Sequence, residues 1–498
     1  MFDPTTRFYL IAAVAAFLVF IVVYSIYISR KIKTYEDYNV AGRSVPIFPL
    51  VLTIMGTAIG GSTVLGFTAS GYALGIGRSW EILPAYIVVV FVIVVMLKAI
   101  RNIGSKYNLV TIPDYTALRY GEKARLPSAI AMLLAYCAIT GMQYTAVGTF
   151  LHIISGLDLV TGILIGWLIL AAKTALGGLK AVIWADSIQG TIQNIGIIIL
   201  FIFLFVLIGG YAGAAEKAVA IGEPELMNLF SMPFEELLVF LLTLGGYQVI
   251  RQDSWQRIWA ARDMKIAVSG FWISTIFGFI VTAAIFSLGT FGRLIGVTVE
   301  DPSLAFYMIS DAVLPAALLV IVITALMATI ISCADSNLVA GASSMINDII
   351  KPRLKTGDDK TLLRCSRYAV IATSLVSLIL ALYIPRLIEL WVTGTAMLTS
   401  GLMIPVLAAL FWKKATRAGG VAAIWGGLVT AVAWQIFGHP FGLHPVYIGV
   451  PVSLTLLVTV SLFTTIAPDE PVEELLYKNN RSSQPGTTGP GPLKQYHS

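Results

Sequence analysis

Long apolar runs alternate with short polar segments along almost the whole chain. Each run is about 20 residues long, which is the length an α-helix needs to cross a bilayer. The runs occur near residues 8–29, 47–70, 81–100, 126–155, 159–177, 184–210, 234–252, 267–292, 312–345, 366–385, 389–412, 419–438 and 446–466. This pattern predicts an all-α integral membrane protein with about 13 transmembrane helices, and an odd number places the two termini on opposite sides.

Two of these runs are interrupted by glycine and polar residues. The first interruption lies in residues 53–71, TIMGTAIGGSTVLGFTASG, and the second lies at the glycine pair of residues 241–254, LLTLGGYQVIRQDS. Glycine weakens a helix, and unpaired backbone groups are costly in hydrocarbon unless protein or a water-filled cavity covers them. Interruptions at corresponding places in two halves of a chain indicate broken helices that bind a ligand. The alternative is that small residues only let two helices pack closely.

The composition supports a membrane location. Of 498 residues, 57% are hydrophobic and 12% are charged, and the mean hydropathy is +0.85, whereas soluble domains carry about 25% charged residues. Lys and Arg gather in alternate loops, which predicts an outside N-terminus and a cytoplasmic C-terminus in the cell membrane. The net charge of +6 therefore reflects topology rather than nucleic-acid binding. The first run is followed by the basic segment RKIK, which predicts a retained anchor rather than a cleaved signal peptide.

The sequence gives little support to an enzyme. Its three cysteines have no metal-binding or disulfide spacing, and its four histidines form no metal cluster. Nucleophile elbows, phosphate loops and HExxH motifs are absent from the sequence. We expect no organic cofactor and no metal other than sodium.

The most polar stretch inside an apolar run is residues 329–337, TIISCADSN. On a helix, Ser332, Asp335 and Ser336 share a face, and Thr329 lies one turn earlier. An acid at this depth is by default a functional hypothesis, and oxygen ligands suit a hard cation such as sodium. The alternative is a polar contact between two helices.

Asp186 is the second acid inside an apolar run. Gln189, Gln193 and Asn194 continue a polar stripe along the same predicted helix, which indicates a wet cavity. The alternative is that Asp186 only stabilises a helix N-terminus through the helix dipole.

Amphipathic residues near the interruptions are candidates for solute binding. Gln143 lies in the middle of an apolar run, and Arg251 and Asp253 follow the second interruption. Arg251 and Asp253 are either solute-binding groups or an interfacial salt-bridged cluster with Arg257 at the cytoplasmic edge. The sequence slightly favours the interfacial cluster.

Several motifs together resemble the sodium/solute symporter family, which contains the proline, glucose, sialic acid, pantothenate and choline carriers. They are AGRSVPIFPL (41–50), IPDYTALRYGEKAR (112–125), ALGGLKAVIWADSIQG (175–190), QDSWQRIWAARD (252–263) and ISCADSNLVAGASSM (331–345). The resemblance implies a core of ten helices in two inverted repeats of five, as in the leucine-transporter-type fold, with the first helix of each repeat broken.

The resemblance, together with the polar composition of the loop before residue 233 and of the tail after residue 467, implies a division of the chain into six segments. These are an extra transmembrane helix and loop (1–45), the first repeat (46–210), an extracellular loop (211–232), the second repeat (233–412), two C-terminal transmembrane helices (413–466) and a disordered cytoplasmic tail (467–498).

The family's main sodium site lies where the first broken helix meets the eighth core helix. Its ligands would be the carbonyls of Gly56 and Ile59 and the side chains of Thr329, Ser332 and Cys333. The family usually has Ser or Thr at Cys333, and a thiol is a poor ligand for a hard cation. Some members have a second sodium site nearer the cytoplasm, which maps to Asp186, Ser332, Asp335 and Ser336.

We therefore expect a sodium-coupled symporter that carries a small organic solute into the cell by alternating access, and that works as a monomer. The candidates for solute contact are Thr57, Ser62, Gln143, Tyr247 and Arg251. The alternatives are proton coupling through Asp186 or Asp335 in the same fold, or a transporter-like solute sensor. An ion channel is less favoured because no repeated pore-loop signature occurs, and the sequence does not reveal the solute.

Overall fold

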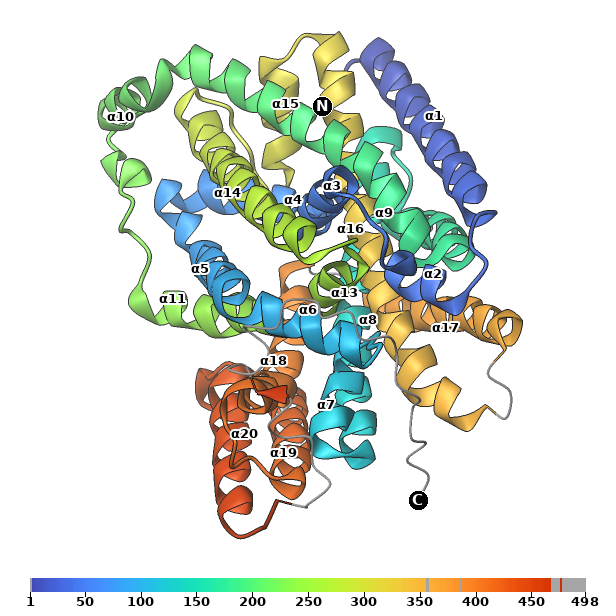
Figure 1. Cartoon of the computed structure of the whole chain (residues 1–498). Coiled ribbons are helices and arrows are strands. Elements are labelled where there is room, and N and C mark those ends of the chain that lie inside the picture. Colours follow the sequence, from blue (N-terminus) through green and yellow to red (C-terminus); the bar gives the residue numbers. More distant parts are fainter. Residues whose placement is uncertain (1, 355–357, 385–386, 467–474, 477–498) are drawn as a thin grey trace.

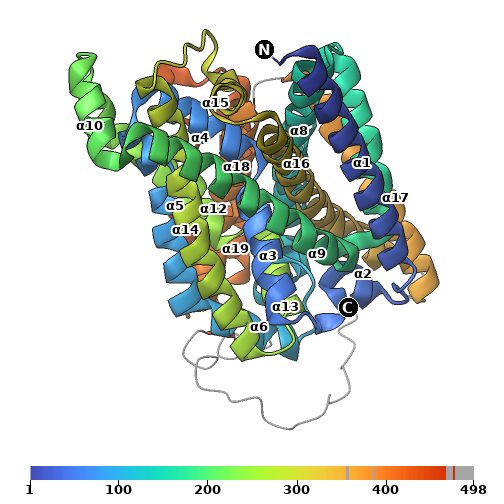
Figure 2. The same cartoon turned by 90° about the horizontal axis from the view of Figure 1, so that it is seen from above.

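The fold is built almost entirely from helices, as expected (Figure 1, Figure 2). The structure is a computed structural model that describes residues 2–354, 358–384, 387–466 and 475–476. The α-helices are α1 (Pro4–Ser29), α2 (Tyr35–Val40), α3 (Ile47–Ala58), α4 (Gly61–Leu74), α5 (Leu83–Phe91), α6 (Leu97–Lys106), α7 (Ile112–Tyr120), α8 (Arg125–Ser155), α9 (Leu159–Ile208), α10 (Gly210–Ala220), α11 (Phe234–Phe240), α12 (Gly246–Val249), α13 (Gln252–Ala260), α14 (Met264–Leu294), α15 (Ala305–Val313), α16 (Ala316–Ser344), α17 (Asp359–Tyr383), α18 (Leu387–Phe411), α19 (Arg417–Ile436) and α20 (Pro445–Leu462).

The described residues contain ten helices long and apolar enough to cross a membrane, or eleven if α3 and α4 form one span. The expected number of about thirteen is therefore not confirmed. One reason is α9, a single 50-residue element where the sequence predicts two runs. A straight helix of that length would be about 75 Å long, and the hydrocarbon core is only about 30 Å thick. Gly178 interrupts α9 with a non-helical conformation (φ 50°, ψ −163°) between the two predicted runs.

Helix α16 lies in the middle of the molecule (Figure 2). It packs against α9, α8, α3 and α17, and all its side chains from Ala325 to Ser344 are buried. Small residues such as Ala, Gly and Ser let neighbouring helices approach closely. The polar stretch of residues 329–337 consequently faces protein on every side.

Helices α18, α19 and α20 form a group at one edge of the molecule (Figure 1). Helices α19 and α20 lie where the sequence predicts two C-terminal membrane helices. The expected tail over 467–498 lies outside the described residues, apart from Leu475 and Leu476. The boundaries of the two expected repeats remain predictions.

Helices α3 and α4 form the first broken helix, with a bend of 52° between them. The helical conformation ends at Ala58, and Ile59 and Gly60 have ψ angles of 85° and 177°. Both residues have negative φ, so the backbone there does not require glycine. The next residue, Gly61, is required for lack of space, because a Cβ there would lie 2.3 Å from Cγ1 of Ile330 on α16.

The apolar run with the second interruption also contains a broken helix. The break lies one turn beyond the glycine pair, where the sequence predicts it. Gly245 and Gly246 keep helical angles at the end of a π-helical turn, and the chain leaves the helical conformation at Ile250 and Arg251. A Cβ on Gly246 would lie 2.7 Å from Cγ2 of Thr399 on α18. Gly246 therefore serves close helix packing, and the break falls between α12 and α13.

The crossing of α4 and α14 gives a prediction about stability. A Cβ on Gly71 would lie 2.2 Å from the backbone oxygen of Phe286, and a Cβ on Gly289 would lie 2.0 Å from that of Thr68. Backbone atoms cannot rotate away, so Gly71→Ala and Gly289→Ala should each lower the free energy of unfolding by about 1–3 kcal/mol. Thermal unfolding in mild detergent checks this.

The matched control for these two variants is Gly401→Ala in α18. A Cβ there would make an ordinary contact of 3.4 Å with Cβ of Leu428. Alanine is the better helix former, so this variant should unfold at the wild-type temperature or slightly above it. Equal unfolding temperatures for all three variants would show that the α4–α14 crossing tolerates added volume.

Candidate functional site

The bend between α3 and α4 faces the polar stretch of α16. A Cβ on Gly56 would lie 2.5 Å from Oγ of Ser332, and a Cβ on Gly60 would lie 2.6 Å from Sγ of Cys333. The Cys333 thiol also lies 3.5 Å from the carbonyl oxygen of Thr57. The backbone of the broken helix thus touches the hydroxyl and thiol groups of α16 directly.

Carbonyl oxygens at the end of α3 are available to a ligand. A helix leaves the carbonyls of its last turn without partners inside the helix. The Met55 carbonyl accepts a hydrogen bond from Ile59 N–H, but among the described residues no backbone N–H outside regular helices bonds to the carbonyls of Gly56 or Ile59. On α16, Thr329 donates its hydroxyl proton to the Ala325 carbonyl at 2.8 Å, which leaves the Thr329 oxygen able to accept. Oxygen atoms of this kind bind hard cations.

Asp186 of α9 lies opposite the same part of α16. Its carboxylate accepts hydrogen bonds from the hydroxyls of Ser332 and Thr53, both at 2.6 Å. The Ser336 hydroxyl donates to it at 3.2 Å. The side chain of Asp186 is fully buried. Three members of the expected second site, Asp186, Ser332 and Ser336, are therefore brought together.

A buried guanidinium completes this group of side chains. Nη2 of Arg257, on α13, lies 2.8 Å from Oγ1 of Thr53 and 2.7 Å from Oγ1 of Thr57. The same nitrogen lies 2.6 Å from Oγ of Ser336 and 3.3 Å from Oδ2 of Asp186. We define these five residues as the Arg257 cluster. Arg257 is only 1% exposed, and its Nη1 also lies 3.8 Å from the Asp253 carboxylate, so the ion pair expected between these two residues forms with Arg257 buried in protein.

Asp335 lies apart from the Arg257 cluster. Its carboxylate forms an ion pair with Nζ of Lys173 and accepts a hydrogen bond from the Thr174 hydroxyl at 2.6 Å. Both partners belong to α9, and all three side chains are buried. Asp335 lies roughly 100° around α16 from Ser336. The structure thus separates Asp335 from the other three members of the expected second site.

Three solute candidates, Thr57, Ser62 and Gln143, lie near the first break. Thr57 belongs to the Arg257 cluster, and Ser62 is buried in the first turn of α4. Gln143 of α8 approaches Gly60, with Nε2 3.3 Å from the position of a Cβ there. Within the described residues, neither polar atom of the Gln143 side chain has a hydrogen-bond partner. Because buried amides are normally paired, Gln143 marks a place for water or solute.

The other two candidates, Tyr247 and Arg251, lie beside the second break. Nε of Arg251 lies 2.9 and 3.0 Å from the two carboxylate oxygens of Asp253, and the guanidinium lies 5.9 Å from the Tyr247 ring centroid. Arg251 also lines a cavity of about 70 Å³ together with Ala58 and Thr63. Ligand pockets usually span roughly 300–1,000 Å³. The cavity therefore admits water in this conformation but is too small for an organic solute.

The polar stripe of α9 continues from Asp186. Gln189 and Gln193 lie one and two turns farther along the same face. Both are fully buried, and their side-chain amides have no hydrogen-bond partner among the described residues. Water in the cavity expected along this helix would give these two buried amides the hydrogen-bond partners that they lack.

Sequence analysis does not assign three of the residues that line these sites, Thr53, Lys173 and Thr174, and it names Arg257 only as a partner of Arg251 and Asp253. The sequence could have indicated the role of Lys173, because this residue lies within the apolar run 159–177. A buried cation requires an acidic partner. The spacing of Arg257 from Asp253 suggests only a local pair on one helix. Its contact with Asp186 arises from the tertiary fold.

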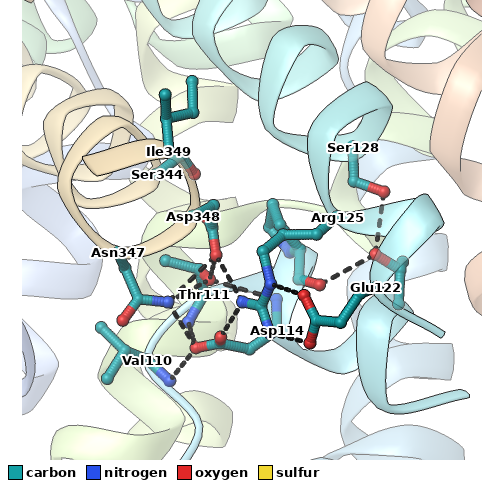
Figure 3. Close-up of polar contacts among 12 residues, drawn as sticks. Val110, Thr111, Asp114, Glu122, Arg125, Ser128, Ser344, Asn347, Asp348 and Ile349 are labelled. Atoms are coloured by element: carbon teal, nitrogen blue, oxygen red, sulfur yellow. Dashed lines mark hydrogen bonds and ion pairs between the residues drawn. The ribbon is translucent and has the colours of Figure 1, made fainter. Parts of the chain in front are cut away.

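A separate polar network joins α7, α8 and the end of α16 (Figure 3). The Arg125 guanidinium lies 2.5 Å from the carboxylate of Asp114 and 3.1 Å from that of Asp348. Thr111 donates to Asp348 at 2.9 Å, and the Asn347 amide donates to Asp114 at 2.7 Å. The motif IPDYTALRYGEKAR supplies Asp114 and Arg125, so it builds this network rather than the ion site.

Known proteins resemble this chain over most of its length. Residues 38–429 match the sodium:solute symporter family. The high-affinity proline transporter PutP of Bacillus subtilis (strain 168) is 26% identical over 463 residues, which cover 89% of this chain and 96% of that protein. The sodium/pantothenate symporter of Escherichia coli (strain K12) is 25% identical over 489 residues, which cover 93% and 98%.

Solved structures share the fold. A Na⁺-coupled sialic acid symporter in a substrate-bound outward-open state aligns with a TM-score of 0.76 at 18% identity, covering 92% of this chain and 98% of that one. Mhp1, a nucleobase-cation-symport-1 family transporter in a closed conformation, aligns with a TM-score of 0.57 at 14% identity, covering 88% and 97%. The expected leucine-transporter-type fold is confirmed, and the chain is a membrane transport protein rather than an enzyme. With most of its length matched, the chain belongs to the sodium:solute symporter family.

Proposed function

We propose that this protein couples the entry of sodium to the entry of a small organic solute by alternating access. The observation that carries the proposal is the contact between the α3–α4 break and the hydroxyl-bearing part of α16. There, the backbone at Gly56 lies beside Ser332 and the backbone at Gly60 beside Cys333, and among the described residues no backbone N–H outside regular helices bonds to the carbonyls of Gly56 or Ile59. A sodium ion bound by these oxygens would join the broken helix to α16.

Sodium and solute are coupled in this proposal through the backbone around Gly60. An ion that fixes the carbonyls before Gly60 also fixes the backbone that faces the unpaired Gln143 amide. Each ligand then raises the affinity for the other by the same factor. The solute binds between Gln143 and the cavity lined by Arg251, once that cavity widens.

The driving force comes from the membrane potential and the sodium gradient. One charge that crosses the membrane releases about 2.3 kcal/mol per 100 mV. With the N-terminus outside and the C-terminus in the cytoplasm, as the loop charges predict, this force draws sodium and solute into the cell. All the proposed contacts lie within one chain, so we propose a monomer as the transporting unit.

Accumulation in proteoliposomes tests the proposal. Labelled proline and labelled pantothenate, the solutes named for the two relatives, are the first compounds to compare. A broader screen of small amino and carboxylic acids follows. An inward sodium gradient should drive accumulation that an equal potassium gradient does not support, and dissipating the sodium gradient should release the solute.

The alternatives predict other outcomes in the same vesicles. Accumulation driven only by an inward proton gradient would support proton coupling. Solute binding without accumulation under any gradient would support a sensor. Current in the absence of solute, with no solute accumulation, would support a channel.

The thiol at Cys333 gives a prediction about ion affinity. Cys333→Ser supplies an oxygen that binds a hard cation better than sulfur does, so the sodium concentration for half-maximal stabilisation should fall a few-fold. A sodium titration of the unfolding temperature measures this. Cys137→Ser makes the same chemical change in α8, where the thiol faces the Thr373 carbonyl at 3.8 Å, and it should leave the titration unchanged. A weaker response in Cys333→Ser would place the ion elsewhere.

A further inference from the structure

We propose that Arg257 takes the place of a second coupling cation, so that the protein binds one sodium ion and carries a tethered positive charge at the second position. This inference rests on the proposed function, since it concerns the ion count of the same transporter. It is drawn from the contacts of a single nitrogen atom, Nη2 of Arg257.

The surroundings of Nη2 match those of a bound cation. Four oxygens lie 2.6–3.3 Å from it, and they come from Thr53 and Thr57 on α3, Asp186 on α9 and Ser336 on α16. An NH₂ group has two protons, so four oxygen neighbours exceed what directional hydrogen bonds alone can use. A cage of one carboxylate and three hydroxyl oxygens is the kind of donor set that a hard cation requires.

The hydroxyl protons point away from Nη2, which leaves lone pairs toward it. Thr53 and Ser336 donate to the Asp186 carboxylate at 2.6 and 3.2 Å. Thr57 donates to the Thr53 carbonyl at 2.8 Å. Every hydroxyl in the cage can therefore accept from the guanidinium, and the Asp186 charge is balanced.

The anchoring of Arg257 keeps this charge in place. Its Nη1 donates to the Asp253 carbonyl at 3.0 Å, and its Nε approaches the Thr53 hydroxyl at 3.1 Å. The side chain is buried, so its charge is weakly screened and would repel a sodium ion entering the same cage. Arg257 is a residue of α13, just after the second break, and its side chain contacts α3 in the first broken helix.

Asp335 offers no substitute site for a second ion. Its carboxylate is already paired with Lys173 and accepts from Thr174. Both acids of the expected second site, Asp186 and Asp335, are thus neutralised by side chains of this chain. In this proposal, a sodium ion therefore binds at the α3–α4 break and not beside Asp186 or Asp335.

Sodium-binding stoichiometry of the purified full-length protein tests the inference. Radioactive sodium is titrated at pH 8 against the wild type, Arg257→Gln, Arg257→Lys, Asp186→Asn and the double variant Arg257→Gln with Asp186→Asn. The wild type should bind one sodium per chain. Arg257→Gln should bind two, because it leaves an ionised cage without its cation. Arg257→Lys, which keeps a tethered charge, and the double variant, which removes the carboxylate, should each return to one.

Each other outcome has a definite meaning. Two ions bound by the wild type, with one lost in Asp186→Asn, would overturn the inference, and this comparison remains decisive if Arg257→Gln does not fold. A folded Arg257→Gln that gains no ion over the wild type would also overturn it. Zero ions bound by the wild type would contradict the proposed function instead. In that case a single ion gained by Arg257→Gln, and absent in Arg257→Lys, would still support the role of Arg257.

Discussion

Replacing Lys173 with methionine should lower the free energy of unfolding by about 3–5 kcal/mol. The Lys173 ammonium is the charged partner of Asp335, and both side chains are buried between α9 and α16. Methionine fills similar space but leaves an uncompensated carboxylate inside the protein. Thermal or denaturant unfolding in mild detergent measures the loss.

Lys180→Met on the same helix is the matched control. Lys180 pairs with Asp37 at 2.6 Å, but both side chains are partly exposed to solvent. A pair of this kind contributes only about 0–1 kcal/mol, so the control should remain close to the wild type.

Adding Asp335→Asn to Lys173→Met should restore most of the lost stability. The double variant removes both buried charges, and the Thr174 hydroxyl can still bond to the amide. Equal losses in Lys173→Met and Lys180→Met would show that Lys173 and Asp335 are not a buried charged pair.

Ser332→Ala should raise the sodium concentration for half-maximal stabilisation by about tenfold or more, which corresponds to about 1.4 kcal/mol or more. Ser332 lies at the contact between Gly56 and α16, where the ion is proposed to bind, and it also donates to Asp186 at 2.6 Å. Its removal deletes an ion ligand and one of the three hydroxyl donors of Asp186. A sodium titration of the unfolding temperature measures the change.

Ser343→Ala separates ion binding from general stability. Ser343 is also a buried hydroxyl of α16, and it donates to the Asn39 side chain at 3.0 Å, about three turns from Ser332. Its loss should lower the unfolding temperature in all salts and leave the sodium titration in place. An unchanged titration in Ser332→Ala would remove Ser332 from the ion site.

The sequence predicts the helical membrane fold and the first broken helix because both depend on local chemistry. Apolar runs of bilayer length and a Gly-rich interruption are readable without tertiary contacts. At the second interruption, the sequence predicts the break one turn too early. Gly245 and Gly246 look like a break, yet Gly246 is required because α18 approaches at Thr399. A sequence alone does not distinguish glycine needed for space from glycine needed for a bend.

The candidate ion residues are only partly predictable for a similar reason. Helical spacing places Ser332 and Ser336 on one face, and the structure brings Asp186 to that face. The same spacing groups Asp335 with them. In the structure Asp335 instead pairs with Lys173 of α9, a contact that the spacing along α16 does not reveal. The contact of Arg257 with Asp186 is missed because the two residues lie 71 positions apart, beyond any local pattern.

The most direct test of a sodium site is thermal unfolding of the wild-type protein in sodium, potassium and choline chloride at equal ionic strength. A ligand that binds only the folded state stabilises it by about 2.7 kcal/mol at a concentration 100 times its dissociation constant. We predict an unfolding temperature that rises with sodium concentration and stays level in potassium and choline, with most of the rise lost in Ser332→Ala. Equal unfolding temperatures in all three salts across the sodium titration would contradict the account.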